Sequence, residues 1–340
     1  MQQQKVQQET IQHIAVVRLS ALGDVCHAVA VVQAMMRRYP NAKVTWITAP
    51  LEAKLVRMVE GVEVIEYDKK TGFTGMFALR AALKHITFDV LLHLQWSSRS
   101  SVLMRMVKAK RRIGFSLSRS REKQHWFVTE RAPEPRGVHV LDSFLSIASV
   151  LGVTEVRFPC LLNLPEPSFG VPRPYVVVNP CGSKIEKNWT LEGNRAVVMR
   201  LLEKGYTPVL TGGPSELERH FSQQIEKEIQ GVVNLVGKTS VEAMCRLIQD
   251  AHLVVSPDTG PAHIATLVGT PVLGLYALSN PERTGPYQDL QHVVSVYKRL
   301  AEKEYGKPIN DLPWATTVHD PKAMQAIAIE DVLSMLETLI

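Results

Sequence analysis

The sequence lacks a long apolar run and a cysteine framework. Its apolar runs, such as residues 253–255 and 271–276, are no longer than a strand, whereas a membrane-spanning helix needs about 18 residues. Four cysteines, none in a Cys-x-x-Cys pair, indicate a reducing compartment rather than disulfide bonds. Residues 1–10 are rich in glutamine and lack the basic start and apolar stretch of a signal peptide. We therefore expect a flexible tail there and a cytoplasmic protein.

Several nucleotide and metal motifs are also missing. Gly237-Lys238-Thr239 has the ending of a P-loop, but Val232 stands where that motif needs its first glycine. No Gly-x-Gly-x-x-Gly follows the first expected strand, which argues against a dinucleotide dehydrogenase. The sequence contains no Asp-x-Asp pair and no His-Glu-x-x-His. We predict that the protein uses no metal and no cofactor.

Acidic residues are scarce in the first half of the chain. Residues 1–165 carry 23 Lys and Arg against 13 Asp and Glu, a net charge of +10. Residues 166–340 carry 16 against 20, a net charge of −4. The basic half fits an anionic partner, such as a phosphate-bearing lipid, a membrane surface or a nucleic acid, or else ordinary surface variation.

Short β-branched runs alternate with longer helical patterns along the whole chain, which is typical of parallel sheets covered by helices on both faces. The expected strands are residues 14–18, 44–48, 62–67, 89–94, 112–115, 175–179, 208–211, 232–235, 253–256 and 272–276. The expected helices are residues 28–38, 75–85, 98–109, 192–203, 215–229, 241–249, 261–268 and 329–340. The predicted fold class is α/β with two Rossmann-like domains.

A proline-rich segment marks the domain boundary. Four prolines within residues 164–174 are incompatible with the interior of a helix or strand. We predict an N-terminal domain over residues 11–164, a linker over 165–174 and a C-terminal domain over 175–340. The last helix could pack back on the N-terminal domain.

The first stretch with catalytic potential follows the first strand. Gly23 permits a tight turn there, and Asp24 then lies at or near a helix N-terminus. Asp24 could simply cap the helix. Alternatively, it could take a proton from an acceptor hydroxyl, since hydrogen bonds from the helix end favour its charged form.

The second stretch is Ser256–His263, which also joins a strand to a helix. Thr259 and Gly260 offer backbone N–H groups to an anion at a helix N-terminus. Asp258 could orient the loop or accept from a sugar hydroxyl, and His263 could donate to a phosphate or sugar. Alternatively, Asp258 could cap the helix and His263 could be a partly buried histidine without a function. The combination of all eight residues, 256–263, favours the functional interpretation.

Two further loops follow strands of the second half. Residues 179–189 include Ser183, a candidate phosphate contact, and Lys187, which could neutralise a diphosphate. In the glycine-rich segment 211–216, Glu216 could accept from ribose hydroxyls or merely favour the first turn of a helix.

A basic stretch covers residues 99–123, with nine cations against Glu122 alone. This excess favours an anionic surface or acceptor, although solvated helix ends would explain part of it. The candidate acceptor-binding residues are Arg105, Lys108, Arg111 and Arg112.

Taken together, these stretches resemble the ADP-heptose:lipopolysaccharide heptosyltransferases, the ninth glycosyltransferase family. The resemblance covers most of the chain, and its anchors are residues 20–24, 187–189, 212–216 and 256–263. It implies a GT-B architecture, with the nucleotide sugar on the C-terminal domain and the lipid acceptor on the N-terminal domain.

The resemblance also implies roles for single residues. Asp24 matches the family's general base, Lys187 a lysine near the donor phosphates, and residues 258–260 with His263 the donor-site motif, while Glu216 aligns less securely. The implied reaction moves heptose with inversion from ADP-heptose to Kdo or heptose on lipid A, at the inner face of the inner membrane, with no nucleic acid involved. Alternatives are a transferase or epimerase that uses another nucleotide sugar, and a non-catalytic sugar-nucleotide-binding protein. Residues 288–320 have no assigned role.

The missing metal motifs lead to a first prediction. Sugar transfer by this protein should survive an excess of EDTA, because cations and helix N-termini rather than a metal would stabilise the departing diphosphate. Initial rates with and without chelator measure this. A complete loss of turnover that returns with added divalent metal would contradict the prediction.

Overall fold

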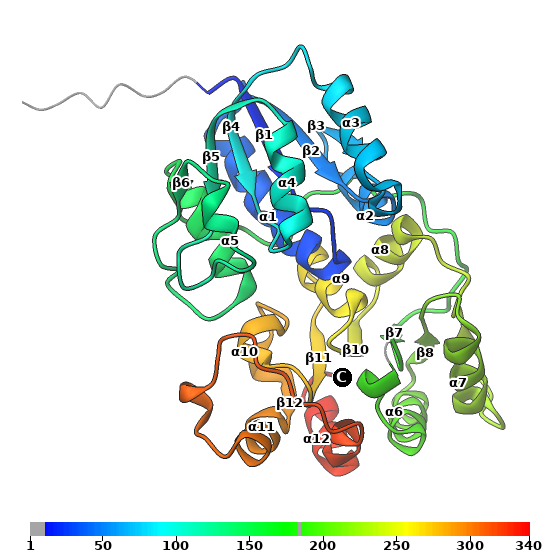
Figure 1. The fold of residues 1–340 in the computed structure, drawn as a ribbon. Coiled ribbons are helices and arrows are strands. Elements are labelled where there is room, and N and C mark those ends of the chain that lie inside the picture. Colours follow the sequence, from blue (N-terminus) through cyan, green and yellow to red (C-terminus); the bar gives the residue numbers. More distant parts are fainter. Residues whose placement is uncertain (1–10, 183–184) are drawn as a thin grey trace, which may run out of the picture. The chain divides into compact units, whose positions relative to one another are not determined.

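The computed structural model describes residues 11–182 and 185–340, which form two compact units (Figure 1). Unit 1 contains the residues up to Ser20, Val31–Arg136 and Ser143–Val156. Unit 2 contains Ala21–Ala30, Gly137–Asp142 and Arg157–Ile340. Each unit holds a six-stranded parallel sheet. The α/β class and the two Rossmann-like domains are therefore confirmed.

The sheet of unit 1 has the strand order β3-β2-β1-β4-β5-β6. Its strands are β1 (His13–Val17), β2 (Lys43–Thr48), β3 (Val62–Glu66), β4 (Phe88–His93), β5 (Ala109–Gly114) and β6 (Glu130–Arg131). The helices that accompany it are α1 (Leu22–Arg38), α2 (Pro50–Val56), α3 (Gly72–Ala82), α4 (Ser98–Met106) and α5 (Val140–Ser149). The order reverses between β1 and β4, and ligands bind α/β sheets at such a reversal.

The sheet of unit 2 repeats this order, as β12-β11-β10-β7-β8-β9. Its strands are β7 (Tyr175–Val178), β8 (Thr207–Leu210), β9 (Val233–Asn234), β10 (Leu253–Pro257), β11 (Val272–Tyr276) and β12 (Val293–Ser295). Its helices are α6 (Leu191–Glu203), α7 (Glu216–Glu226), α8 (Val241–Gln249), α9 (Gly260–Val268), α10 (Pro281–Thr284), α11 (Tyr297–Tyr305) and α12 (Ile329–Glu337). The reversal here lies between β7 and β10.

Local sequence explains where many of these elements begin. Strands β7, β10 and β11 are buried along their whole length, which accounts for their continuous apolar runs. Four helices begin behind a hydroxyl side chain that accepts from the backbone N–H three residues later: Ser97, Thr190, Ser215 and Ser240. In the described part of the chain, none of the helices is both long and apolar enough to cross a membrane.

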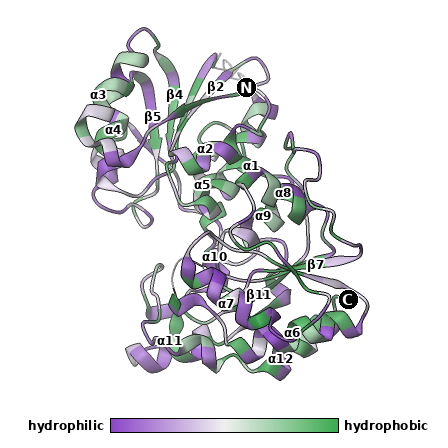
Figure 2. Ribbon diagram, turned by 90° about the vertical axis from the view of Figure 1, so that its right-hand side faces the viewer, coloured by the Kyte–Doolittle hydropathy of each residue, from purple (hydrophilic) through white to green (hydrophobic). Residues whose placement is uncertain are grey.

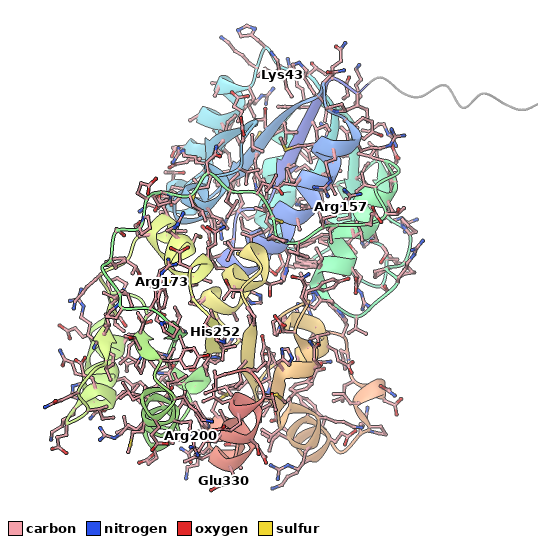
Figure 3. All side chains as sticks on the ribbon, turned by 180° about the vertical axis from the view of Figure 1, so that it is seen from behind. Lys43, Arg157, Arg173, Arg200, His252 and Glu330 are labelled. Carbon is pink, nitrogen blue, oxygen red and sulfur yellow. The ribbon has the colours of Figure 1, made fainter. Side chains whose placement is uncertain are left out.

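The boundary between the units differs from the predicted one. Residues from Arg157 onward already belong to unit 2, because the backbone N–H of Cys160 donates to the carbonyl of Leu267 in α9 at 2.8 Å. Further along, Arg173 forms an ion pair with Asp250 at 2.7 Å, and Figure 3 labels Arg173 near His252. The proline-rich segment therefore lies along unit 2 before β7 begins.

The last helix packs into the apolar core of unit 2. Val332 and Leu336 of α12 are fully buried in the same apolar core as Val176, Val198 and Trp189. The indole N–H of Trp189 donates to the carbonyl of Ile327, just before α12, at 3.2 Å. The C-terminal helix thus closes the core of the unit that carries it.

This packing predicts a stability effect. Leu336→Ala should lower the free energy of unfolding by about 2–5 kcal/mol, because the buried leucine leaves a cavity. Ser334→Ala, on the exposed face of the same helix, should change it by less than about 0.5 kcal/mol. Urea denaturation followed by circular dichroism measures both, and equal effects would contradict the placement of α12.

Candidate active site

Buried polar groups fix the chain as it leaves β1. The Arg18 side chain, 2% exposed, donates to the carbonyl of Leu94 at the end of β4, at 2.6 Å. The amide oxygen of Gln95 accepts from the backbone N–H of Leu19 at 2.9 Å and of Ser20 at 3.3 Å. The loop that leads to Asp24 is thereby tied to the strand beside β1, at the reversal of strand order.

Helix α1 begins earlier than the sequence indicated, at Leu22 instead of residue 28, so that Asp24 lies in its first turn. Gly23 is therefore helical and does not form a tight turn. A Cβ atom on Gly23 would lie 2.3 Å from Cδ2 of His263. A glycine is required because the start of α1 lies directly against the imidazole at the start of α9.

Asp258, in the loop between β10 and α9, is the centre of a polar network. Lys187 Nζ donates to its Oδ2 at 3.0 Å and to its backbone carbonyl at 2.9 Å. Ser279 Oγ donates to the same Oδ2 at 2.6 Å, and His263 Nε2 lies 3.4 Å from Oδ1. These contacts connect the loop between β10 and α9 to the segments that carry Lys187 and Ser279.

The network keeps Asp258 ionised. Burial acts to raise the pKa of its carboxyl group, but the hydrogen bond from His263 and the charge of Lys187 outweigh burial and hold that pKa well below its usual value. A charged carboxylate with only 13% of its side chain exposed needs such partners, since an unpaired buried charge is costly.

Thr259 connects the two loops at the reversal of strand order in unit 2. Its Oγ1 accepts from Asn179 Nδ2, after β7, at 3.0 Å and lies 2.9 Å from Ser256 Oγ. A Cβ atom on Gly182 would approach the Thr259 methyl group to 2.8 Å. Thr259 is the N-cap residue of α9 and makes no side-chain cap bond, and Gly260 begins the helix.

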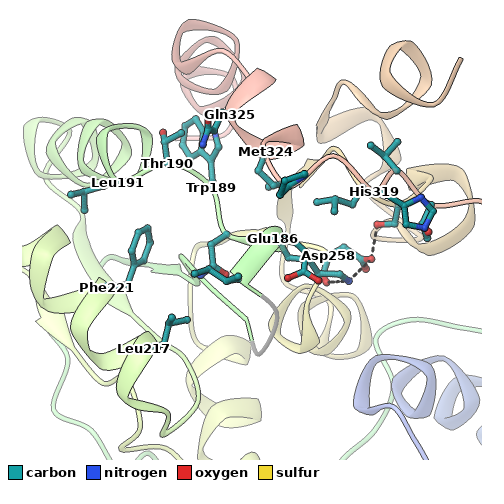
Figure 4. A pocket seen from close by; sticks show the side chains of 18 of the residues that line it. Glu186, Trp189, Thr190, Leu191, Leu217, Phe221, Asp258, His319, Met324 and Gln325 are labelled. Atoms are coloured by element: carbon teal, nitrogen blue, oxygen red, sulfur yellow. Dashed lines mark hydrogen bonds and ion pairs between the residues drawn. The ribbon is translucent and has the colours of Figure 1, made fainter. Parts of the chain in front are cut away.

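A cavity of about 1240 Å³ opens beside this network (Figure 4). One part of its wall is apolar and comes from both ends of unit 2: Trp189, Leu191, Leu217, Phe221, Val318 and Met324. Another part is polar: Lys187, Asn188, Asp258, Ser279, Arg283 and His319. Drug-sized ligands occupy about 300–1,000 Å³, so this cavity has room for a nucleotide sugar.

Sequence reasoning missed the residues that line the cavity from the far end of the chain. Ser279 and Thr317 form an isolated antiparallel bridge, which brings Thr317 and His319 to the cavity wall. Arg283 reaches the wall from α10 and stacks on Trp314 at 4.4 Å. No motif marks these residues, since they meet the site only through tertiary folding.

Buried histidines surround the start of α1. The His27 ring lies 5.0 Å from that of His263 and 4.9 Å from that of His139. His139 Nδ1 accepts from the backbone N–H of Leu141, so its Nε2 donates to the carbonyl of Gly285 at 3.0 Å. Burial lowers the pKa of His139 to about 4, so this imidazole is neutral at physiological pH.

Two further residues, Ser183 and Glu216, were predicted as donor contacts. Ser183 lies outside the described residues. Glu216 is exposed as the first residue of α7 and is not among the described residues that line the cavity. The buried carboxylate of this helix is Glu218, which accepts from Gly213 N–H at 2.9 Å and from Ser215 Oγ at 2.6 Å. Glu218 thus shapes the glycine-rich loop by capping.

The four predicted acceptor contacts differ in their surroundings. Arg111 is paired through two bonds of 2.7 Å with Glu130 on the neighbouring strand. Arg112 donates to two backbone carbonyls, those of Val107 and Ala109. Arg105 and Lys108 are exposed. Arg111 and Arg112 therefore have structural partners within unit 1.

The described residues offer no group of three or more His, Cys, Asp or Glu side chains that could hold a metal ion. Among the described residues that line the cavity, Lys187 and Arg283 are the Lys and Arg side chains.

Comparison with known proteins agrees with this geometry. Residues 76–312 match the model of glycosyltransferase family 9, the heptosyltransferases. A lipopolysaccharide core heptosyltransferase, OpsX, from Haemophilus influenzae is 40% identical over 339 residues, which cover 97% of this chain and 98% of the relative.

Solved structures share the fold. A family 9 glycosyltransferase from Veillonella parvula has a TM-score of 0.77 at 22% identity, over 96% of this chain and 97% of that one. The heptosyltransferase WaaC of Escherichia coli, solved with ADP, has a TM-score of 0.75 at 18% identity, over 97% and 100% of the two chains. Because the family model matches most of the chain and a relative is 40% identical over nearly its whole length, the chain belongs to glycosyltransferase family 9 and is a heptosyltransferase.

Proposed function

We propose that this heptosyltransferase moves heptose from ADP-heptose to Kdo or heptose of the lipopolysaccharide inner core, with Asp24 as the general base. The observation that carries this proposal is the network around Asp258 beside a large cavity in unit 2, with the first turn of α1 against His263. The similarity to OpsX of Haemophilus influenzae, a lipopolysaccharide core heptosyltransferase, supports the substrate class.

The donor nucleotide occupies the cavity of unit 2 in this proposal. The apolar wall, with Leu217 and Phe221 on one side and Met324 on the other, suits the flat face of an adenine base (Figure 4). Lys187 and Arg283 supply positive charge for the diphosphate. The backbone N–H groups at the start of α9 add an anion-binding helix end.

Lys187 acts at two points in this scheme. Its Nζ donates to Asp258, and a diphosphate would compete for the same ammonium group. Ser279 and His263 remain on Asp258 when Lys187 turns to the phosphates, so the carboxylate stays paired. Moving Lys187 to the donor phosphates therefore costs less free energy than it would if Asp258 were left as an unpaired buried charge.

The chemical step is a displacement with inversion. The acceptor hydroxyl loses its proton to Asp24 while its oxygen bonds to the anomeric carbon of heptose. The bond between that carbon and the diphosphate oxygen breaks, and ADP leaves with the electron pair. Lys187 and the N-terminus of α9 stabilise the negative charge that develops on the leaving group.

The acceptor is a lipid-linked saccharide, which implies a reaction at the inner face of the inner membrane. The basic unit 1 suits an acceptor that carries phosphates and carboxylates. Arg105 and Lys108 are the two exposed candidates among the four predicted contacts. The protein then works in the cytoplasm and binds the membrane peripherally.

The proposal is tested by product analysis with deacylated Kdo-lipid A and a panel of nucleotide sugars that includes ADP-heptose. Transfer from ADP-heptose alone supports it. Transfer from a different donor would reject the assigned donor. Conversion of the donor without transfer would reject the transferase reaction, and the absence of any product would reject catalysis.

A substitution at Lys187 tests the donor site. Lys187→Ala should raise the KM for ADP-heptose by about tenfold or more, because a charge-assisted contact to phosphate is lost. Some stability should also be lost, because Asp258 keeps Ser279 and His263 but loses the ammonium group of Lys187. Lys227→Ala, at an exposed lysine beyond α7, is the matched control. Steady-state kinetics with an unchanged KM in the Lys187 variant would remove Lys187 from the donor site.

A substitution at Asp24 tests the base. Asp24→Asn keeps the shape of the side chain and its ability to cap a helix, but it removes proton acceptance, so kcat should fall about 100- to 10,000-fold. The affinity for ADP should barely change. Asp68→Asn, at a carboxylate that caps a short turn, is the control. A near-normal kcat in the Asp24 variant would reduce Asp24 to a capping residue.

A further inference from the structure

Helix α3 of unit 1 presents two large aromatic side chains to solvent. Phe73 is 71% exposed and Phe77 is 59% exposed. The apolar core of unit 1 is contacted instead by Met76 and Leu79, which are 3% and 4% exposed. The two phenylalanines therefore contribute little to the folding of unit 1 and leave an apolar ridge without a partner in the structure.

The two phenylalanines share a stripe with positive charge. At 100° per residue, Phe73, Phe77 and Arg80 fall within about 60° of one another around the helix. Lys84 follows just beyond the helix end and is exposed, and so is Lys70 just before its start. The stripe thus has an aromatic centre with cations at both ends.

The surroundings of α3 are basic to an unusual degree. Residues 69–121 contain twelve Lys and Arg and a single acidic residue, Asp89. Asp89 is already engaged, since it accepts from Lys110 at 2.8 Å and from the backbone N–H groups of Gln12 and His13. Asp89 and Lys110 neutralise each other, which leaves eleven other Lys and Arg in this range.

Helix α4 extends this basic surface. It packs beside α3, and Lys108, just after it, donates to the carbonyl of Lys84 at 2.9 Å. Figures 1 and 2 show the two helices side by side, with α3 drawn mostly in the hydrophobic colour. Arg99 and Arg105 of α4 are exposed.

We propose that α3 is a membrane-docking element that binds the surface of a bilayer containing anionic phospholipids. Phe73 and Phe77 enter the interfacial region, where aromatic rings are favoured. Arg80, Lys84 and Lys70 meet the lipid phosphates, and charge complementarity selects an anionic surface. With 11 residues, α3 is too short to span a bilayer and lies in the plane of the interface. This function is separate from the donor site and does not depend on the identity of the sugar.

Vesicle binding tests the proposal without any activity measurement. The full chain is sedimented with vesicles of phosphatidylcholine that contain or lack phosphatidylglycerol. Wild type should bind the anionic vesicles. The double variant Phe73→Ser/Phe77→Ser should bind them about tenfold or more weakly, because it lacks the two aromatic rings that enter the bilayer interface. Met199→Ser removes an apolar side chain of α6 that is 51% exposed, and should bind like wild type. Equal binding by the double variant and wild type would overturn the proposal.

Charge and fold are checked in the same assay. Arg80→Glu/Lys84→Glu should weaken binding to anionic vesicles by about tenfold at low salt and by less at high salt. Thermal unfolding of both double variants should match wild type, since the altered side chains are exposed. Binding that is equally strong without phosphatidylglycerol would contradict the role of the cations.

Further measurements distinguish membrane binding from two other partners that could cover Phe73 and Phe77. If α3 paired with a second copy of the chain, sedimentation velocity would show a wild-type dimer that the phenylalanine variant loses, with no vesicle binding by either. If the ridge held the acyl chains of the acceptor instead, wild type would not bind vesicles free of acceptor. Transfer to a deacylated, water-soluble acceptor should be unchanged in the phenylalanine variant, and a loss there would also count against the proposal.

Discussion

The buried carboxylate of Asp258 is the constraint on which the donor side of the molecule depends. A charge removed from water must be paired, and this one is paired by groups from three different segments of unit 2. Lys187 comes from the loop after β7, His263 from α9 and Ser279 from the segment after β11. The same pairing that keeps the acid ionised therefore sets the positions of the loops that line the cavity.

A second constraint connects the predicted base to this network. The start of α1 approaches α9 so closely that residue 23 can carry no side chain. The next residue, Asp24, lies in the first turn of α1. His263 takes part in both contacts, since one edge of its ring lies against Gly23 while its Nε2 faces Asp258. A change at His263 would thus disturb the start of α1 and the network around Asp258 together.

The two units differ in how their charged groups are arranged. Unit 2 encloses polar groups whose charges are paired inside the protein, which suits a small, highly charged donor. Unit 1 carries exposed cations and an exposed aromatic ridge on α3, which suit a large anionic surface. Arg111 and Arg112 show that a cation in a basic stretch is not automatically available for binding, because both are already held by partners within unit 1.

Much of this architecture could be predicted from the sequence, because hydrophobic periodicity and helix caps are local. The alternation of strands and helices, the two sheets and the loops after β1, β7 and β10 all followed from residues close together in the chain. The family resemblance likewise rested on short motifs such as residues 256–263.

Only the tertiary structure decided which groups meet across the chain. The early start of α1, the burial of α12 in its own unit and the place of Arg283 and His319 on the cavity wall carry no local signal. The partners of Lys187 and Arg111 could not be predicted either. The sequence gives the residue type, but it does not show whether water or a carboxylate surrounds the charged group. Burial and pairing are properties of positions in space, and the fold alone assigns them.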